Sequence, residues 1–558
     1  MTWAIDLGNS HTRIARWNEQ RELPELVELP GICRQPGGNE PLAAPRLVPT
    51  ATEVLESDDW RTRVGRWPFV RDLAFLGQRA IIGRPAIERN LTLEQPDFVP
   101  NFKSWLGRRS REVLARTASR TWTAREVAEA FLWELLATVD RQMGERIRDL
   151  VITTPVHAFE SYRAELQTIA KRLGVRRLRF ADEPVAAALG YGLSVGGERR
   201  VLVIDFGAGT LDLALVALDP RGVEMGQCRV LAKDGQELGG NDVDAWFLEE
   251  LVKPFDVDPS HVRGLRESAF WRREMLAEAR RVKEALFFDE WTFFLFHHPD
   301  GTGRPRPGRD RSDPTEIHRQ RLLEVLERHR VAERVEEAIL RVLVEEPEGV
   351  GFDGVDEVLL VGGSTLLPGV YSRAEELFGR SRVRAWEPFE AVALGACVLS
   401  AQRFAQSDVI FHDYAFVTHD TKTHEPQTTV IVPAGTRVPT SERFWTGRVV
   451  PTCALGDLEK LFKLVICEVA RPREGTRFVR DRQGGLYRGD ESGSLVVVPL
   501  NESDPLLGRL DPPHEPSDRK PRLELSFSVD TDRWLRATVD DLKTGKRLLE
   551  SRQVVRLV

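Results

Sequence analysis

Two short turns carry the residue types that could do chemistry, and one of them lies between two apolar runs, residues 201–206 and 211–218. Its centre is Gly-Ala-Gly-Thr, residues 207–210, with Asp205 just before it and Asp212 just after it. Successive backbone N–H groups in such a turn form an anion-binding concavity, and glycine lets a phosphate come close to the backbone. The two carboxylates repel a phosphate but can hold Mg²⁺, or waters on Mg²⁺, that neutralise it. The turn therefore predicts a site for a metal-bound phosphate.

The N-terminal segment 3–17 repeats this plan, with Asp6 and Gly8 after an apolar run and with Asn9 and Ser10 in the turn. Two such turns about 200 residues apart suggest a duplicated domain, in which each copy grips one metal-nucleotide from its own side. An ordinary hairpin with polar turn residues would explain either turn alone. The pair of turns favours a nucleotide site.

Two glycine pairs strengthen this interpretation. Gly239 and Gly240 lie in GQELGGNDVD, and Gly362 and Gly363 end an apolar run in EVLLVGGSTLLPGV. With these pairs in the same chain as the two turns, ordinary hairpins explain the pattern poorly.

Strands and amphipathic helices alternate around the turns, which predicts an α/β fold. Residues 123–142 begin with a capping box formed by Thr123 and Glu126. In residues 158–174 the apolar side chains follow the 3-4-3-4 spacing of one helix face, and residues 316–343 predict another long amphipathic helix. The turns are therefore expected to lie on buried strands that are flanked by helices.

From about residue 408 the pattern changes to short β-rich segments separated by turn residues. This pattern predicts an all-β domain of roughly 145 residues. No long helix is expected after its last strand.

The composition excludes several classes of protein. The net charge of −7 argues against a nucleic-acid-binding protein, which would show a basic footprint. No run approaches the ~20 apolar residues of a membrane span, and the N-terminus lacks the basic and apolar regions of a signal peptide. The five cysteines, far apart and odd in number, are expected to be reduced thiols, which indicates a soluble cytoplasmic protein. They are Cys33, Cys228, Cys397, Cys453 and Cys467.

Longer stretches resemble a known family. VITTPVHAFESYRAELQTIAKRLGVRRLRFADEPVAAALGYGL, VLVIDFGAGTLDLALV and the two glycine-pair segments follow one another as in the seventy-kilodalton heat-shock chaperones, which are DnaK-like members of the actin-like ATPase superfamily. The resemblance implies an actin-like nucleotide-binding domain with two α/β lobes around a cleft in residues 1–405. It implies an interdomain linker in 406–413 and a β-rich, sandwich-like substrate-binding domain in 414–558. The chain looks like an atypical, lidless member, because the family's helical lid has no counterpart before Val558.

The resemblance also implies ATP or ADP with Mg²⁺ and a nearby K⁺ as cofactors. Asp6 and Asp205 match the aspartates that hold the hydrated Mg²⁺, and Lys103 matches the lysine near the γ-phosphate and the attacking water. Such a lysine is a fixed positive charge where phosphoryl oxygens gain charge. The implied catalytic residues are Lys103, Glu183, Asp205, Thr210, Asp6 and Asp212.

The nucleotide contacts that the resemblance implies are Gly8, Asn9, Ser10, Gly207, Ala208, Gly209, Gly239, Gly240, Lys283, Gly362, Gly363 and Ser364. The adenine side departs from the family. Glu284 and Leu366 match two arginines that sandwich the base, and neither can offer a stacked guanidinium plane. Phe287 and Arg280 match a serine and a glutamate. Weak ATP binding with little base selectivity is therefore expected.

Other positions match the parts of the family that couple nucleotide to substrate. Pro155 and Arg163 match a proline switch and its relay arginine, and Arg179 matches an arginine that docks a J-domain cochaperone. Asp408 and Asp413 bracket the apolar linker, in which His412 is a departure from the family. Further expected partners are unfolded polypeptides and a nucleotide exchange factor, without nucleic acid or membrane. Candidates for the peptide pocket are Phe444, Trp445 and Ile466.

The sequence thus predicts an ATP-dependent chaperone that binds extended polypeptide segments. A second hypothesis keeps the fold without turnover, as a nucleotide-sensing or nucleotide-independent binding module, because the adenine side is altered. A sugar-kinase-like enzyme and an actin-like polymer remain as weaker alternatives. Neither of these two explains the β-rich region after residue 408.

Overall fold

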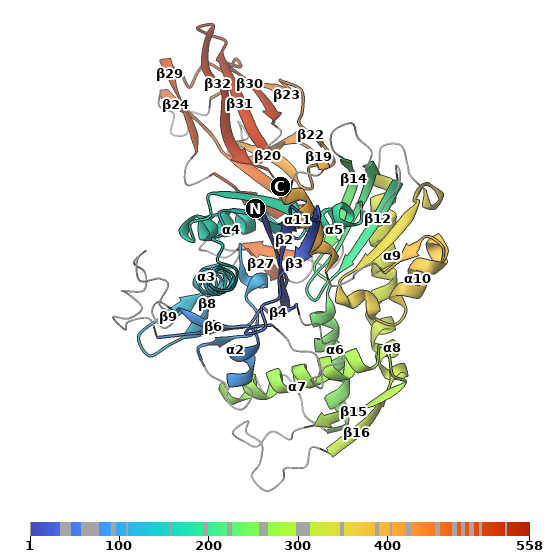
Figure 1. Ribbon diagram of the computed structural model, residues 1–558. Helices are drawn as coiled ribbons and strands as arrows, with labels where there is room; N and C mark the ends of the chain where they lie inside the picture. Colours follow the sequence, from blue (N-terminus) through green and yellow to red (C-terminus); the bar gives the residue numbers. More distant parts are fainter. Residues whose placement is uncertain are drawn as a thin grey trace.

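The computed structural model shows a β domain above two α/β lobes (Figure 1). It describes residues 2–33, 46–56, 78–90, 96–107, 110–156, 158–192, 199–219, 226–255, 266–296, 313–345, 351–385, 390–401, 404–419, 426–451, 458–470, 477–480, 486–489, 496–501, 505–530 and 533–557. Within these ranges no helix is both long enough and apolar enough to cross a membrane.

The first lobe contains a mixed sheet that carries the N-terminal turn. Its strands are β1 (Trp3–Leu7), β2 (His11–Asn18), β3 (Leu23–Leu26), β4 (Val48–Pro49), β10 (Asp149–Thr154) and β11 (Arg177–Asp182). They lie in the order β11-β10-β1-β2-β3, with β4 beside β2. Since β1, β10 and β11 are parallel, their carboxyl ends meet at one edge of the sheet. Asp6 and Asp182 lie at this edge.

The second lobe repeats the arrangement. Its strands are β12 (Arg199–Phe206), β13 (Leu211–Asp219), β14 (Gly226–Gln236), β17 (Glu357–Val361), β18 (Val383–Arg384) and β19 (Phe404–Val409). The β domain adds the short strand β22 (Arg437–Val438) to this sheet, which has the order β18-β17-β12-β13-β14-β19-β22. As in the first lobe, the strand before the turn is antiparallel to its successor and parallel to a later strand. This recurrence agrees with the predicted duplication.

Two helices cross between the lobes. Helix α5 (Glu183–Gly192) follows the last strand of the first lobe but packs against β12 and β13 of the second. Helix α11 (Ala391–Ser400) comes from the second lobe and packs against β1, β2 and β10 of the first. The two helices also pack on each other, and their alanine-rich faces share one buried core with both sheets. Because each sheet packs on a helix from the other lobe, the two turns are held in fixed positions relative to each other.

The remaining helices surround the sheets. They are α2 (Arg84–Arg89), α3 (Ala124–Met143), α4 (Glu160–Arg172), α6 (Gly240–Val252), α7 (Arg266–Ala285), α8 (Arg319–Arg328), α9 (Val331–Glu345) and α10 (Val370–Phe378). The capping box predicted at the start of α3 is present, because Thr123 and Glu126 exchange side-chain and backbone hydrogen bonds. The single helix predicted for 316–343 is wrong. Its first residues belong to a strand, and the helix breaks at Arg330, whose φ is +53°.

Smaller elements complete the two lobes. They are β5 (Thr52–Val54), β6 (Ala80–Ile82), β7 (Phe98–Val99), β8 (Val113–Arg116), β9 (Thr121–Thr123), β15 (Trp291–Phe296), β16 (Asp313–His318) and the 3₁₀ turns η1 (Lys103–Trp105), η2 (Lys253–Phe255), η3 (Phe352–Gly354) and η4 (Gly363–Leu366). Two of these turns, η1 and η4, lie beside the strand edges that carry the two aspartate turns. The described cysteines are free and buried, and Cys453 lies outside the described residues.

The β domain contains two four-stranded sheets. One comprises β20 (Asp413–His419), β21 (Pro426–Val432), β25 (Ile466–Ala470) and β28 (Val496–Pro499); the other comprises β23 (Trp445–Val449), β30 (Leu523–Val529), β31 (Trp534–Asp541) and β32 (Lys546–Arg556). Inward-facing residues of both sheets form a single core, as in a sandwich. Two further pairs are β24 (Glu459–Leu464) with β29 (Leu506–His514) and β26 (Arg477–Arg480) with β27 (Leu486–Gly489).

A backbone connection joins the lobes to the β domain. Strand β19, which includes the first part of the predicted 406–413 linker, runs parallel to β14 of the second lobe. It is also antiparallel to the short strand β22 from the β domain, with Asp408 opposite Val438. The two domains therefore share a continuous ladder of backbone hydrogen bonds.

The crossing of α5 and α11 depends on a close approach at Gly395. A Cβ atom at this position would lie 1.5 Å from the Ala186 carbonyl oxygen. We expect Gly395→Ala to lower the unfolding free energy by about 1–3 kcal/mol, because backbone must move to admit the methyl group. Gly351→Ala, whose added methyl group meets no described residue within 4 Å, is the matched control. Equal thermal midpoints for the two variants would contradict this account of the crossing.

Candidate functional site

The two aspartate turns face each other across the lobes. Each is closed by a backbone hydrogen bond, from Gly8 N–H to the His11 carbonyl (3.1 Å) and from Gly207 N–H to the Thr210 carbonyl (2.9 Å). The Asn9 side chain reaches so close to Gly209 that a Cβ there would lie 1.9 Å from Asn9 Nδ2. The structure therefore brings together the two turns that the sequence predicts as the halves of one site.

Four carboxylates gather at these turns, and we call them the carboxylate cluster: Asp6, Glu183, Asp205 and Asp212. Each is buried, with exposed fractions of 5%, 7%, 7% and 0% in that order. Burial raises the pKa of Asp205 well above its usual value, and the charges of the other three raise it further. Such a cluster requires positive charge nearby.

Lys103, on η1, supplies part of that charge. Its Nζ donates to Glu183 Oε1 at 2.7 Å, and both side chains are buried. Burial alone would lower the pKa of Lys103, but Glu183, Tyr162 and Asp6 together outweigh burial and the pKa is raised. Lys103 therefore stays protonated. Burial raises the pKa of Glu183 to about 7, and Asp212 and Asp6 add to the increase, against the opposing effect of Lys103.

A second ion pair in the carboxylate cluster joins Asp6 to Arg13. The sequence did not predict this pair. Arg13 Nη1 donates to Asp6 Oδ2 at 2.8 Å, and Thr153 Oγ1 donates to Asp6 Oδ1 at 2.9 Å. Each Asp6 oxygen thus accepts one hydrogen bond within the protein, and a carboxylate oxygen can accept a further one from a metal-bound water. Among the described residues there is no group of three or more His, Cys, Asp or Glu side chains arranged to hold a metal ion. The expected contact of Asp6 and Asp205 with Mg²⁺ is mainly through water, so a hydrated metal shell there stays a prediction.

Both glycine pairs pack against the 207–209 turn. Gly240 N–H, at the start of α6, donates to the Gly207 carbonyl at 3.1 Å, and Ser364 Oγ donates to the same carbonyl at 2.7 Å. A Cβ at Gly239 would lie 2.3 Å from the Ala208 carbonyl oxygen. Gly362 has φ +84°, and a Cβ there would lie 2.8 Å from Asp205 Oδ1. Only glycine fits at Gly239 and Gly362, which explains one member of each pair.

Beside the first glycine pair, at Gly240, Asp244 of α6 pairs with two cations of α7. Its carboxylate oxygens lie 2.6 Å from Lys283 Nζ and 2.7 Å from Arg280 Nε. Burial opposes ionisation, but Lys283 and Arg280 hold the pKa of Asp244 below its usual value. The sequence analysis named both cations but missed Asp244. Because Arg280 is held by Asp244, it lies in an ion pair rather than free to stack on a base.

Comparisons with known proteins agree with this architecture. A family model described as Hsp70 protein matches residues 80–449, more than half of the chain. The chain belongs to the Hsp70 protein family. Its relatives include chaperone protein DnaK of Thermus thermophilus (28% identical, covering 85% of this chain and 73% of the relative) and of Ureaplasma urealyticum serovar 10 (24%, covering 85% and 71%). The DnaK of Thermotoga neapolitana is 25% identical over 84% of this chain and 71% of that protein. Family members are ATP-dependent chaperones that use ATP or ADP with Mg²⁺, and this places the Hsp70 chain in that functional class.

In this Hsp70 chain, Arg163 and Asp182 lie at the contact with the β domain. Arg163 Nη2 donates to Asp182 Oδ1 at 2.6 Å, and Lys233 Nζ donates to Asp182 Oδ2 at 2.7 Å. From the β domain, Arg533 Nη2 lies 4.0 Å from the same carboxylate. Burial opposes ionisation, but Lys233, Arg163 and Arg533 hold the pKa of Asp182 below its usual value. Arg533 occupies the left-handed region, with φ +62°.

A second contact centres on Glu468 of β25. This fully buried carboxylate lies 2.7 Å from His412 Nδ1 and accepts a hydrogen bond from Tyr414 OH at 3.1 Å. Its Oε2 accepts from Glu160 N–H, at the start of α4, at 3.2 Å. The His412 ring also stacks on Phe159, with ring centres 5.0 Å apart. His412, the departure within the linker, is thus part of the domain contact.

The other residues predicted to couple nucleotide to substrate, Pro155, Arg179 and Asp413, lie in different parts of the structure. The residue after Pro155, Val156, donates its N–H to Asp212 Oδ1 at 3.0 Å. Arg179 donates to the Leu399 and Ser400 carbonyls at the end of α11. Asp413 Oδ1 accepts from Ala434 N–H at 2.7 Å inside the β domain.

The three candidates for a peptide pocket do not share one surface. Ile466 is fully buried in the core between the sheets of the β domain. Trp445 packs on that core, with its ring edge against Phe416 at 5.5 Å. Phe444 is 39% exposed. Of the three, Phe444 alone presents an open side chain, and the peptide pocket stays a prediction.

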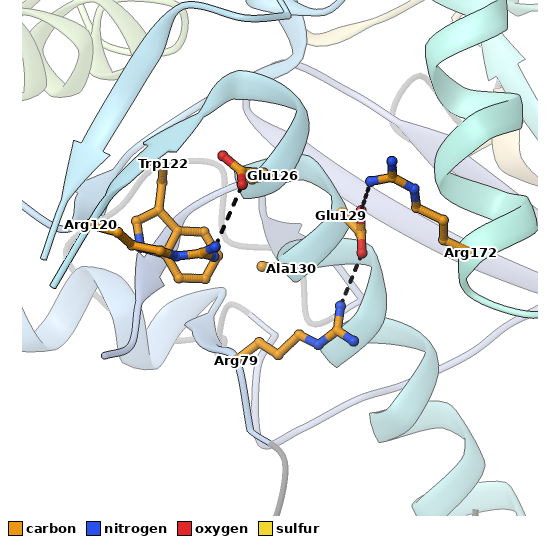
Figure 2. Close-up of a pocket in the computed structure, with 7 residues that line it drawn as sticks. All are labelled: Arg79, Arg120, Trp122, Glu126, Glu129, Ala130 and Arg172. Carbon is orange, nitrogen blue, oxygen red and sulfur yellow. Dashed lines mark hydrogen bonds and ion pairs between the residues drawn. The ribbon is translucent and has the colours of Figure 1, made fainter. Parts of the chain in front are cut away.

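A small polar pocket of about 140 Å³ lies apart from the turns, along α3 (Figure 2). Arg79 and Arg172 both pair with Glu129, at 3.1 and 2.9 Å, and Arg120 pairs with Glu126 while covering the Trp122 ring. Its charges are paired internally, so it does not compete with the carboxylate cluster as the functional site.

Lys103→Ala should reduce kcat for ATP hydrolysis about 10²–10³-fold, because a fixed positive charge beside the transferred phosphoryl group is lost. Nucleotide affinity, measured by calorimetry, should change much less. Lys171→Ala, which removes an exposed lysine from α4, is the control for the loss of charge. Hydrolysis at the wild-type rate by the Lys103 variant would remove Lys103 from the catalytic residues.

Proposed function

We propose that this Hsp70 chain uses ATP bound between its two turns to control how the β domain holds extended polypeptide segments. The observation that carries the proposal is the pair of facing turns around a buried carboxylate cluster, connected by short contacts to the β domain. In this function the backbone amides of the turns bind the phosphates. Lys103 stabilises the charge that develops on the phosphoryl oxygens.

The described residues 155–156 and 158–160 contact the site at one end and the β domain at the other. At one end, Val156 N–H binds Asp212 of the carboxylate cluster. At the other end, Phe159 stacks on His412 and Glu160 N–H binds Glu468. A shift of Asp212 on nucleotide binding would therefore move a segment that contacts the β domain directly. A segment that can adopt two arrangements can carry energetic coupling between two distant sites.

Substrate binding is assigned to the β domain because sheet edges add an extended peptide through backbone hydrogen bonds. The exposed side chain of Phe444 supports a contact with an apolar peptide residue. A J-domain cochaperone that docks near Arg179 and a nucleotide exchange factor are the proposed partners. We assign the protein to the cytoplasm, the compartment that its reduced cysteines favour.

A nucleotide-sensing module with little turnover is the second candidate. Glu284 and Leu366 stand where two stacking arginines are expected, and Arg280 is held by Asp244. This observation favours weak binding of the base, with the phosphates supplying most of the affinity.

The two candidates differ in turnover. We expect the purified chain to hydrolyse ATP and to do so faster in the presence of a reduced, unfolded polypeptide. We also expect ATP and GTP to bind within about tenfold of each other, a difference of about 1.4 kcal/mol. Calorimetry with both nucleotides and a phosphate-release assay measure these quantities. Nucleotide binding without hydrolysis would support the sensing module, and polypeptide that neither binds nor stimulates would exclude the chaperone.

Docking of the β domain should depend on pH through Glu160. Burial at the contact raises the pKa of Glu160 from 4.5 to about 7, and Glu468 contributes to the increase. Arg163, Arg556 and Arg533 oppose it. Because the docked state favours the protonated carboxyl, docking is most stable below about pH 4.5 and weakens as the pH rises through 7.

Fluorescence energy transfer between a label on each domain measures docking from pH 6 to pH 8. The docked fraction should fall over this range in the wild type and stay nearly constant in Glu160→Gln. Glu88→Gln, at an exposed position on α2, should keep the wild-type profile. An unchanged slope in Glu160→Gln would assign the pH dependence to another group.

A further inference from the structure

We propose that Tyr162 is a positioning residue for ATP hydrolysis, whose hydroxyl donates a hydrogen bond to Glu183 when the Lys103 ammonium turns from Glu183 toward the phosphoryl group. The inference rests on the proposed nucleotide site. It goes beyond that site because it gives a role to a side chain outside the two turns and the glycine pairs. It also explains how Lys103 can move away from its buried partner.

The buried ion pair between Lys103 and Glu183 has to loosen during hydrolysis. Lys103 Nζ lies 2.7 Å from Glu183 Oε1, and both side chains are buried. To stabilise charge on the phosphoryl oxygens, the ammonium must shift toward them, and its contact with Glu183 then lengthens. Withdrawing one member of a buried ion pair is strongly unfavourable, because the other is left without compensation. A second donor beside Glu183 would reduce this penalty and so lower the barrier.

Two contacts place Tyr162 between η1 and the start of α5, the two elements that the ion pair joins. Tyr162 lies in the first turn of α4, and a Cβ at Gly107, two residues after η1, would lie 3.0 Å from its backbone nitrogen. The next residue, Arg163, donates from Nη2 to Asp182 Oδ1 at 2.6 Å. Asp182 is the last residue before α5. The first turn of α4 is therefore fixed against both elements.

The Tyr162 hydroxyl is an unused donor that faces the ion pair. It is buried and has no hydrogen-bond partner among the described residues. The residue is 6% exposed and belongs to the same core as Phe102 and Leu106, which lie on either side of η1. Burial raises the pKa of Tyr162 to about 12, Lys103 opposes the increase and Glu183 adds to it. The phenol therefore stays protonated at neutral pH and keeps a donor for a carboxylate.

A buried hydroxyl without a partner is unfavourable, and a phenylalanine would fill the same core without that penalty. The proposed exchange gives the hydroxyl of Tyr162 an acceptor in another state of the site. Its acceptor, Glu183, becomes available at the moment when the carboxylate loses its cation. Hydrogen bonds to charged groups are stronger than those between neutral groups, so one hydroxyl can replace part of the lost ion pair.

Tyr162→Phe removes only the hydroxyl and tests the inference. In single-turnover measurements the variant should hydrolyse ATP about 10- to 100-fold more slowly, the factor expected for the loss of a hydrogen bond to a charged group. Its affinity for ATP, measured by calorimetry, should stay within about threefold of the wild type, because the exchange belongs to the transition state. Tyr371→Phe, which removes a hydroxyl from a side chain of α10 that is 37% exposed, is the control and should behave as the wild type.

Thermal unfolding of the nucleotide-free protein provides a readout that does not depend on ATP. In the wild-type background, Tyr162→Phe should leave the midpoint unchanged or raise it, because the hydroxyl has no acceptor there. Lys103→Met mimics the departure of the ammonium, so in this background Tyr162→Phe should lower the midpoint by a few degrees. The loss should vanish when Glu183→Leu is added as well. Such non-additivity is expected of residues that interact directly.

The outcomes separate the inference from the proposed function. A wild-type rate of hydrolysis in Tyr162→Phe would overturn the inference and leave the proposed function intact. A midpoint that Tyr162→Phe lowers in the wild-type background, or lowers equally in both backgrounds, would also overturn it and would make the hydroxyl a structural part of the core. Absence of ATP hydrolysis by the wild type would overturn both the inference and the proposed function.

Discussion

The burial of four carboxylates around two facing turns is the constraint on which the rest of the structure depends. Buried carboxylates are costly unless cations or hydrogen bonds stabilise them. The carboxylate cluster obtains most of these from residues far away in the sequence: Lys103 pairs with Glu183, Thr153 binds Asp6 and Val156 binds Asp212. Arg13, on the strand that follows the first turn, also binds Asp6. Each of these contacts ties a separate element to the turns. The site is therefore the point where the two lobes are joined electrostatically as well as through packing.

Packing and charge act on the same helix. Glu183 is the first residue of α5, and the alanine face of α5 crosses α11 at Gly395 to hold the lobes together. A change in the charge beside Glu183 thus acts on the element that sets the relation between the lobes. Asp212 extends this connection outward, through Val156, toward the β domain. In the proposed function, a charge bound beside Glu183 and Asp212 would therefore act both on α5 and on Val156.

Local features were predictable from the sequence, and nonlocal ones were not. The two turns, the capping box at Thr123 and the glycine pairs are patterns within a few residues, and the structure contains them. The break at Arg330 was missed because the apolar spacing continues across it without glycine or proline. Asp244 and Arg13 were missed because each acts through a partner on another element or strand. In hindsight, an arginine at an inward position of the strand opposite Asp6 was the available signal for Arg13.

The contact between the lobes and the β domain combines two kinds of interaction. The β19 ladder is made of backbone hydrogen bonds, which fix register but tolerate many side chains. Around it lie buried charges, with Asp182 among three cations and Glu468 beside His412. Buried ion pairs contribute little net stability, yet they become strongly unfavourable when one partner is withdrawn. Such a contact is specific when complete and weak when disturbed. This combination suits a domain that must dock and release as the charges in the neighbouring site change.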